Sequence, residues 1–183
     1  MIRVFDFLFA SIGLILLSPL FVILYIIGFF DTGSPIFRQE RVGKNMRPFD
    51  LLKFRSMLVD TQSVATHLVQ TTSITAWGTF LRKSKLDELP QLYNVLIGDM
   101  SFVGPRPNLY NQTELITARS EKKVYSVRPG ITGLAQIKKI DMSTPDLLAN
   151  TDSEMIQNFD LEKYFKIIFL TLSGKGWGDR AKY

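Results

Sequence analysis

The chain begins with a long apolar stretch whose pattern predicts membrane helices. From Phe7 to Phe30 there are 24 uncharged residues, with Asp6 before them and Asp31 after them. At about 1.5 Å per residue, a helix of this length would cross a hydrocarbon layer about 30 Å thick. The stretch therefore predicts a membrane anchor.

Ser18 and Pro19 interrupt this stretch at its midpoint. Proline has no N–H and clashes with the carbonyl of the preceding turn, and lipid offers no water to the freed carbonyl. A serine hydroxyl can bond back to such a carbonyl, which also bends the helix. We therefore expect a sharp kink. The residues alone leave two topologies open: a kinked spanning helix, and a helix-break-helix that enters and leaves by the same face.

The next segment combines strand periodicity with basic residues. Apolar and polar positions alternate on both sides of the turn formers Gly43 to Asn45, which predicts a β-hairpin from about Ile36 to Met57 with a basic exposed face. By the positive-inside rule, this charge places the bulk of the chain in the cytoplasm. The basic residues are Arg38, Arg41, Lys44, Arg47, Lys53 and Arg55.

The stretch SKLDELPQLYNVLIGDM has leucines at helical spacing, and Gly98 predicts the end of the helix. Proline is harmless only in the first helical turn, so Pro90 predicts a start between Leu86 and Glu88. This places Asp87 and Glu88 at the helix N-terminus, where the helix dipole favours ionised carboxylates.

Two further helices are predicted at Pro107 to Lys123 and Leu161 to Leu172, and the second could lie in the core or at a membrane interface. Residues 59 to 76 show no clear periodicity and predict a loop, which contains the single histidine, His67. The predicted fold class is α+β, mainly helical.

Composition narrows the chemistry of the 183-residue chain. It contains no cysteine and one histidine, which excludes disulfides, thiolate nucleophiles and zinc–sulfur sites. A metal here would be a hard ion held by oxygen, such as Mg²⁺. The net charge of +5 indicates an anionic partner: nucleic acid, a phosphorylated ligand or a lipid surface.

Asp87 and Glu88 are candidate nucleophile and magnesium ligands, and Asp99 could join them if the chain folds back. Two Pro-Gly loops, GDMSFVGPRP and VRPGITG, hold Arg106 and Arg128 in a rigid backbone that suits phosphate binding. Together these features indicate phosphoryl transfer involving a lipid, at a site on the membrane surface.

The sequence resembles the bacterial monotopic phosphoglycosyl transferases, the initiating sugar transferases of glycoconjugate assembly, in their small form with the catalytic domain alone. Four blocks carry the resemblance in order along the chain: FDFLFASIGLILLSP, FRQERVGKNMRPFDLLKFRSM, KLDELPQLYNVLIGDMSFVGPRP and VRPGITGLAQ. The resemblance implies transfer of a sugar 1-phosphate from a UDP-sugar to polyprenyl phosphate, with Mg²⁺ and release of UMP. An N-acetylated sugar is the expected donor group, and O-antigen, capsule or glycoprotein glycan the expected pathway.

The resemblance also implies roles for individual residues. Asp87 would be the nucleophile of a covalent aspartyl phosphosugar, with Glu88 as the second member of the dyad, and both would be metal ligands. Phosphate or nucleotide contacts would come from Lys53, Arg55, Arg106 and Arg128.

By the same resemblance, residues 1–34 form a re-entrant membrane helix that breaks at Ser18 and Pro19. Residues 35–183 form a catalytic domain that rests, with amphipathic helices, on the cytoplasmic face of the bacterial inner membrane. The expected partners are the UDP-sugar, polyprenyl phosphate and membrane lipids, without nucleic acid.

One position departs from the family pattern: Ile140 stands where many members have an arginine after GLAQ. Lys138 or Lys139 could substitute as point charges, or the segment DMSTP could form a different sugar pocket. Two other functions stay open, a membrane-tethered basic module that binds nucleic acid or anionic lipid, and a nucleotide-sugar hydrolase.

Overall fold

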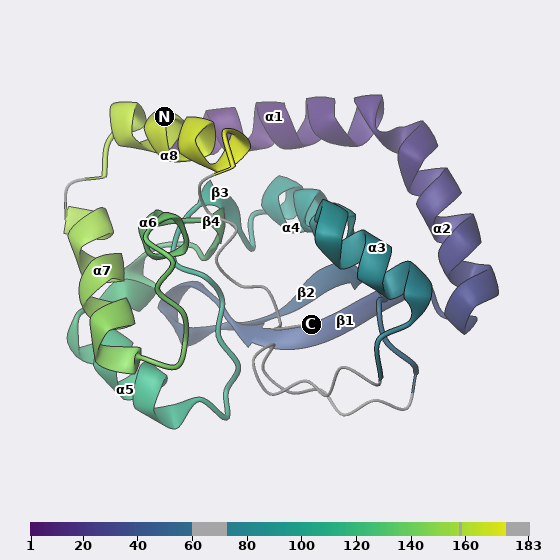
Figure 1. The fold of residues 1–183 in the computed structure, drawn as a ribbon. Helices are drawn as coiled ribbons and strands as arrows, with labels where there is room; N and C mark the ends of the chain where they lie inside the picture. The colour runs from purple at the N-terminus through teal and green to yellow at the C-terminus, as the bar shows by residue number, and fades with distance from the viewer. Residues whose placement is uncertain (60–72, 158, 175–183) are drawn as a thin grey trace.

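The computed structural model describes residues 1–59, 73–157 and 159–174, and everything stated below concerns these residues. Helices surround two small two-stranded sheets (Figure 1). The mainly helical α+β class is therefore confirmed. The predicted loop at 59–76 falls mostly outside the described residues, as does His67.

Helices α1 (Ile2–Leu16) and α2 (Ser18–Thr32) meet at an angle of 64° (Figure 1). Pro19 lacks the N–H that would bond to the carbonyl of Ile15, and the hydroxyl of Ser18 donates to that carbonyl instead, at 2.8 Å. The predicted kink and its serine compensation are confirmed. Within the described residues, no single helix is long and apolar enough to cross a membrane, but this bent pair satisfies both criteria together.

Helix α1 is packed into the core through a buried carboxylate. Asp6 is 2% exposed and accepts three hydrogen bonds, from the hydroxyls of Ser101 and Tyr164 (both 2.9 Å) and the amide of Phe102 (3.1 Å). A buried charge needs such partners, so Asp6 fixes the rotation of α1 against the rest of the fold. Helix α1 and the elements that carry Ser101, Phe102 and Tyr164 are thus one packed unit.

The predicted hairpin is present as β1 (Ile36–Val42) and β2 (Pro48–Phe54), antiparallel and joined by a 3₁₀ turn, η1 (Lys44–Met46). Its exposed face is less basic than expected, because Arg41 points inward and is 7% exposed. Arg38 on the same strand is exposed, as predicted.

Helix α4 (Gln91–Ile97) ends at Gly98, as predicted, with the glycine in the left-handed region at φ 99°. It begins later than predicted. The preceding residues form a 3₁₀ turn, η4 (Leu86–Glu88), in which the amides of Glu88 and Leu89 bond three residues back. Asp87 and Glu88 therefore lie in this turn, before the first turn of the α-helix.

Asn94 joins α4 to the hairpin. Its side-chain oxygen accepts from the amide of Leu52 (3.0 Å) and its side-chain nitrogen donates to the carbonyl of Asp50 (2.8 Å). The side chain thus replaces a strand partner at the open edge of β2, and it is 1% exposed. Asn94 was not among the residues predicted to matter for the fold or the site.

The remaining elements complete the fold. The short strands β3 (Ser101–Val103) and β4 (Gly130–Thr132) pair in parallel. Helix α5 (Thr113–Glu121) begins six residues later than the predicted Pro107, because residues 107 to 112 form a loop with a turn at 110–111. The 3₁₀ turn η5 (Val124–Ser126) follows it, and the helices not predicted are α3 (Ala76–Ser84), α6 (Leu134–Ile137) and α7 (Pro145–Gln157).

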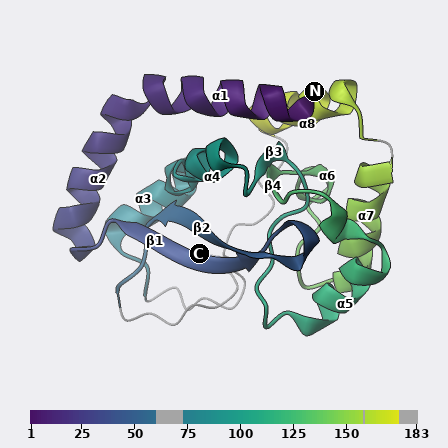
Figure 2. The same ribbon diagram turned by 180° about the vertical axis from the view of Figure 1, so that it is seen from behind.

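Helix α8 (Leu161–Leu172) has the predicted bounds and lies beside the start of α1 (Figure 2). One face buries Tyr164 and Ile167 in the core, while Phe169 and Leu172 are 71% and 81% exposed. The helix is therefore part of the core on one side. Its placement at a membrane interface stays a prediction.

We expect Asn94→Leu to destabilise the protein by about 2–4 kcal/mol, because it leaves an amide and a carbonyl of β2 unpaired against a buried apolar side chain. Chemical denaturation of the detergent-solubilised protein measures this. The exposed Asn111 offers a matched control, since Asn111→Ala should change the free energy of unfolding by less than about 0.5 kcal/mol. A loss at Asn94 no larger than at Asn111 would contradict the role of this amide.

Candidate active site

The hairpin and η4 bring Lys53 and the two adjacent acids together. The ammonium of Lys53, on β2, lies 2.9 Å from a carboxylate oxygen of Glu88. Both side chains are about one-fifth exposed, at 20% and 23%, so water screens the pair only in part. Asp87 is half-buried beside them.

The cations around Glu88 decide its protonation. Burial alone would raise its pKa, but the charges of Lys53, Arg106 and Lys85 outweigh burial and lower the pKa to about 2. Glu88 is therefore ionised at neutral pH.

Asp87 behaves in the opposite way. Burial raises its pKa to about 6, and the negative charge of Glu88 adds to the rise, while Lys53, Arg82 and Arg106 oppose it. One acid of the pair is thus a permanent anion, and the other ionises just below neutral pH. A carboxylate acts as a nucleophile in its ionised form, and its raised pKa makes the oxygen of Asp87 more basic while leaving it ionised at neutral pH.

Arg106 reaches this pair from a loop after β3. Its charge acts on both carboxylates. The loop lies against β4, and a Cβ at Gly130 would come within 2.0 Å of the amide nitrogen of Gly104. Glycine is required there for the two Pro-Gly loops to approach each other.

Two predicted contact residues lie elsewhere. Arg128 donates from Nε to the carbonyl of Gly98 (2.7 Å), at the end of α4 opposite the two acids. Arg55 donates to the carbonyl of Ser34 (2.7 Å) between α2 and β1, and its guanidinium lies over the ring of Phe37. The structure thus gathers Asp87, Glu88, Lys53 and Arg106, whereas Arg55 and Arg128 bind backbone at other points. Their proposed phosphate contacts stay predictions.

Three cations that the sequence analysis did not assign surround the acids. The charge of Arg82, on α3, lowers the pKa of Asp87, and the charge of Lys85 lowers the pKa of Glu88. Burial, with the charge of Arg106, lowers the pKa of Arg41 to about 10, so Arg41 stays protonated at neutral pH. The run RKSKLDE carries two of these cations beside the acids and could have indicated them.

The guanidinium of Arg82 has a buried nitrogen that donates no hydrogen bond to the described part of the chain. Its Nε donates to the hydroxyl of Ser56 (2.8 Å), and its buried Nη1 has no hydrogen-bond partner in the described part of the chain. Buried donors without a partner are rare and are typical of sites that receive a ligand.

The residues present fit a magnesium ion only if the substrate completes its coordination. In the described ranges, no three acids or histidines come close enough to form a metal site. Asp99 does not join the pair, because its carboxylate lies 3.5 Å from the amide nitrogen of Asn94. Mg²⁺ commonly binds through one or two carboxylates, with water and phosphate oxygens as further ligands, and Asp87 and Glu88 could supply these two.

Ile140 packs against an apolar cluster instead of facing a phosphate. The cluster consists of Leu115, Ala135 and Leu148. Lys138 forms an exposed ion pair with Glu154 at 2.9 Å. In the segment after GLAQ, Ile140 therefore packs in the core and Lys138 pairs with an acid on the surface. The expected role of this segment in sugar binding stays a prediction.

We expect a carboxyl group that loses its proton near pH 6 in the metal-free protein. The infrared difference between wild type and Asp87→Asn, with EDTA present, isolates its protonated-carboxyl band. Because this pKa is higher in the folded than in the unfolded chain, the stability that Asp87 contributes falls as pH rises from 3.8 to about 6. A midpoint at the ordinary value of 3.8 would contradict this assignment.

The sequence matches known proteins along most of its length. Residues 1–175 match the family described as bacterial sugar transferase. The chain is 38% identical to UDP-glucose:undecaprenyl-phosphate glucose-1-phosphate transferase of Escherichia coli (strain K12), covering 99% of this chain and 41% of that protein. It is 35% identical to undecaprenyl-phosphate galactose phosphotransferase of Salmonella typhimurium, covering 92% of this chain and 39% of that protein.

A third relative is similar in length. The chain is 38% identical to the exopolysaccharide production protein ExoY of Rhizobium meliloti, covering 93% of this chain and 83% of that protein. The chain spans only about two-fifths of the other two relatives. These matches, together with the gathered acids and cations, show that the chain belongs to the bacterial sugar transferase family.

Proposed function

We propose that the protein transfers a sugar 1-phosphate from a UDP-sugar to polyprenyl phosphate and releases UMP. The observation that carries the proposal is the convergence of the two acids with Lys53 and Arg106. An ionisable nucleophile among fixed cations suits attack on a diphosphate. The Escherichia coli relative is named for transfer of glucose 1-phosphate from UDP-glucose to undecaprenyl phosphate.

The reaction proceeds in two displacements at one phosphorus atom. A carboxylate oxygen of Asp87 attacks the phosphorus that carries the sugar, and the bond from this phosphorus to the oxygen of UMP breaks. The sugar phosphate is then held on Asp87 as an acyl phosphate. An oxygen of polyprenyl phosphate attacks the same phosphorus, which frees the Asp87 carboxylate and forms a polyprenyl diphosphate sugar. Such a sequence gives ping-pong kinetics.

The surrounding residues neutralise and orient the phosphates. Lys53 and Arg106 lie close enough to change the pKa of both acids, so they can also stabilise charge that develops on phosphate oxygens. The buried Nη1 of Arg82 supplies a further donor. A magnesium ion held by Asp87 and Glu88 would neutralise part of the diphosphate charge.

The membrane segment supplies the location. Seven of the fifteen residues of α2 have large apolar side chains that are exposed, as have several along α1. Such a surface is typical of contact with lipid. We propose that α1 and α2 form a re-entrant anchor with its tip at Ser18 and Pro19, and that the active site faces the cytoplasm.

An assay with several UDP-sugars identifies the donor sugar. Two of the relatives are named for glucose and for galactose, whereas the resemblance implied an N-acetylated sugar. A panel of UDP-glucose, UDP-galactose and UDP-N-acetylhexosamines therefore belongs in the first assay.

Detergent-solubilised protein should release UMP from one of these donors through repeated turnovers only when polyprenyl phosphate and Mg²⁺ are present, and EDTA should abolish the release. Without the lipid, release should stop at about one UMP per protein molecule, because the covalent intermediate cannot be discharged. Asp87→Asn should lower the rate on the order of 10³-fold or more, because no nucleophile remains. Asp146→Asn, at an exposed acid on α7, is the control and should keep the wild-type rate. Normal turnover by Asp87→Asn would exclude Asp87 as the nucleophile.

Other outcomes identify the alternatives. Free sugar phosphate without lipid acceptor would indicate a hydrolase. Absence of UMP release, with nucleic-acid affinity that falls steeply with salt, would indicate a binding module.

Re-entry predicts that both ends of the anchor lie on the cytoplasmic side. A protease should cut a tag placed before Met1 only from the cytoplasmic side. A thiol reagent should likewise reach a single cysteine at Asn111 only from that side, and the absence of other cysteines makes this labelling specific. A cysteine at Ser18 should be protected from aqueous reagents on both sides. Accessibility of the tag from the periplasm would show a spanning helix.

A further inference from the structure

The backbone around Arg106 is held at four successive carbonyls. Each accepts a hydrogen bond, and the donors come from three segments: β4, α5 and the end of β1. The pairs are Pro105 with the amide of Gly130 (2.9 Å), Arg106 with Nη1 of Arg119 (2.8 Å), Pro107 with Nη1 of Arg41 (3.1 Å), and Asn108 with the amide of Val42 (3.0 Å). Because prolines fix φ on both sides of Arg106, the loop has little freedom left.

Arg119, on α5, is the buried centre of this arrangement and is 1% exposed. Its Nε and Nη2 donate to one oxygen of Asp152, at 3.0 and 2.7 Å. Its Nη1 also donates to the side-chain oxygen of Asn108 (2.9 Å), which accepts from the hydroxyl of Tyr125 as well (3.0 Å). One guanidinium thus links Asp152 on α7 to the Arg106 loop.

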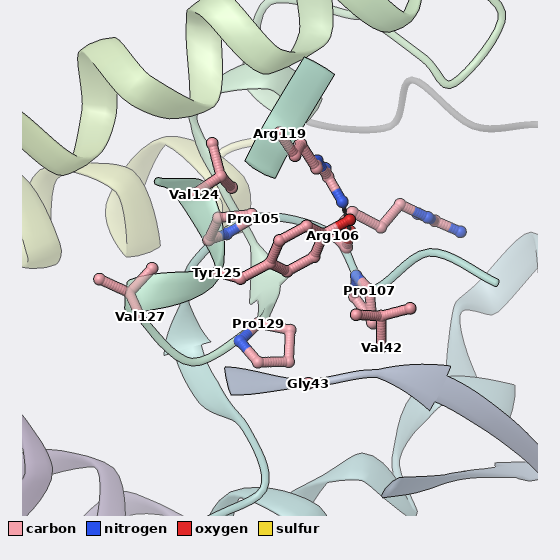
Figure 3. Close-up of a pocket in the computed structure, with 10 residues that line it drawn as sticks. All are labelled: Val42, Gly43, Pro105, Arg106, Pro107, Arg119, Val124, Tyr125, Val127 and Pro129. Carbon is pink, nitrogen blue, oxygen red and sulfur yellow. Dashed lines mark hydrogen bonds between the residues drawn. The ribbon is translucent and has the colours of Figure 1, made fainter. Parts of the chain in front are cut away.

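The close-up shows how these side chains are oriented (Figure 3). Arg119 points toward the backbone of Arg106, while the guanidinium of Arg106 extends away from the ring of Tyr125. The two arginines therefore have separate tasks. Arg119 contacts the backbone of the loop, and Arg106 carries its charge toward the acids.

A buried ion pair is a weak source of net stability, because both charges lose their water. What a guanidinium adds is geometry: its donors lie in one rigid plane, so it can fix a carboxylate and a carbonyl relative to each other. Lysine keeps the charge but not this planar fork. Arg119 binds the carbonyl of Arg106 itself, so it fixes the backbone orientation from which the side chain of Arg106 projects.

We propose that Arg119, held by Asp152, is a positioning residue that orients Arg106 toward the substrate phosphates without touching substrate itself. This inference rests on the proposed function, in which Arg106 contacts phosphate. The competing explanation is that Arg119 only joins α5 to α7 and acts on stability alone.

A double-mutant cycle separates the two explanations, using kcat/KM for UMP release by Arg119→Lys, Arg106→Ala and the double variant. Arg119→Lys should lower kcat/KM by about tenfold in the wild-type background and by less than about twofold when Arg106 is absent. Glu154→Gln, which removes an exposed ion pair on α7, is the control and should stay within about twofold of wild type.

Hydrogen exchange reports on the loop without requiring catalysis. In Arg119→Lys the amides of Val42 and Gly130, which bond to the loop, should exchange at least about tenfold faster. The amide of Leu52, bonded to Asn94, should be unchanged.

Equal losses from Arg119→Lys in both backgrounds, or full activity with unchanged exchange, would overturn the inference. If wild type released no UMP from any donor, the proposed function would fail, whereas the exchange result would still show whether Arg119 holds the loop. If Arg119→Lys did not fold, Tyr125→Phe replaces it, because it removes only the hydroxyl that bonds to Asn108. It should then lower kcat/KM about twofold to threefold with Arg106 present and not without it, and equal losses would again overturn the inference.

Discussion

The arrangement of the site depends on the side-chain amide of Asn94. By bonding to two backbone groups of β2, it fixes the rotation and height of α4 against the hairpin. The acids lie just before α4 and Lys53 lies on β2, so the 2.9 Å contact between Lys53 and Glu88 follows from this docking. The other end of α4 is held as well, since Arg3 donates to the carbonyls of Val95 and Leu96. The turn that carries the acids therefore lies at the end of a helix fixed at two points.

Contacts of α1 connect the proposed membrane anchor to the proposed active site. Arg3 and Asp6 belong to α1, and both bind groups of the catalytic core rather than solvent. The depth and tilt of α1 in a bilayer would therefore set the height of the acids above it. The break at Ser18 lets α1 lie against the core while α2 takes a different direction (Figure 1).

Local patterns predicted the local structure. The alternation around Gly43 gave the hairpin, Gly98 gave the end of α4, and the Ser18–Pro19 pair gave the kink. Positions that depend on distant partners were not predictable: Arg41 turns inward to the carbonyl of Pro107, and Arg128 binds at the far end of α4. Basic residues in Pro-Gly loops look alike in sequence, and only the fold separates those near the acids from those that bind backbone. The residues of α7 have apolar side chains at helical spacing after Pro145, so this helix could have been predicted from the sequence.

We propose that Asp87 is the nucleophile of the two adjacent acids, because burial and its neighbours raise the pKa of Asp87 while nearby cations lower that of Glu88. The most direct measurement is mass spectrometry of protein mixed with the UDP-sugar and quenched before lipid acceptor is added. We expect a mass increase equal to one sugar phosphate, located on the peptide that contains Asp87 and lost when polyprenyl phosphate is supplied. UMP release that requires polyprenyl phosphate from the start, with no adduct at any quench time, would contradict it.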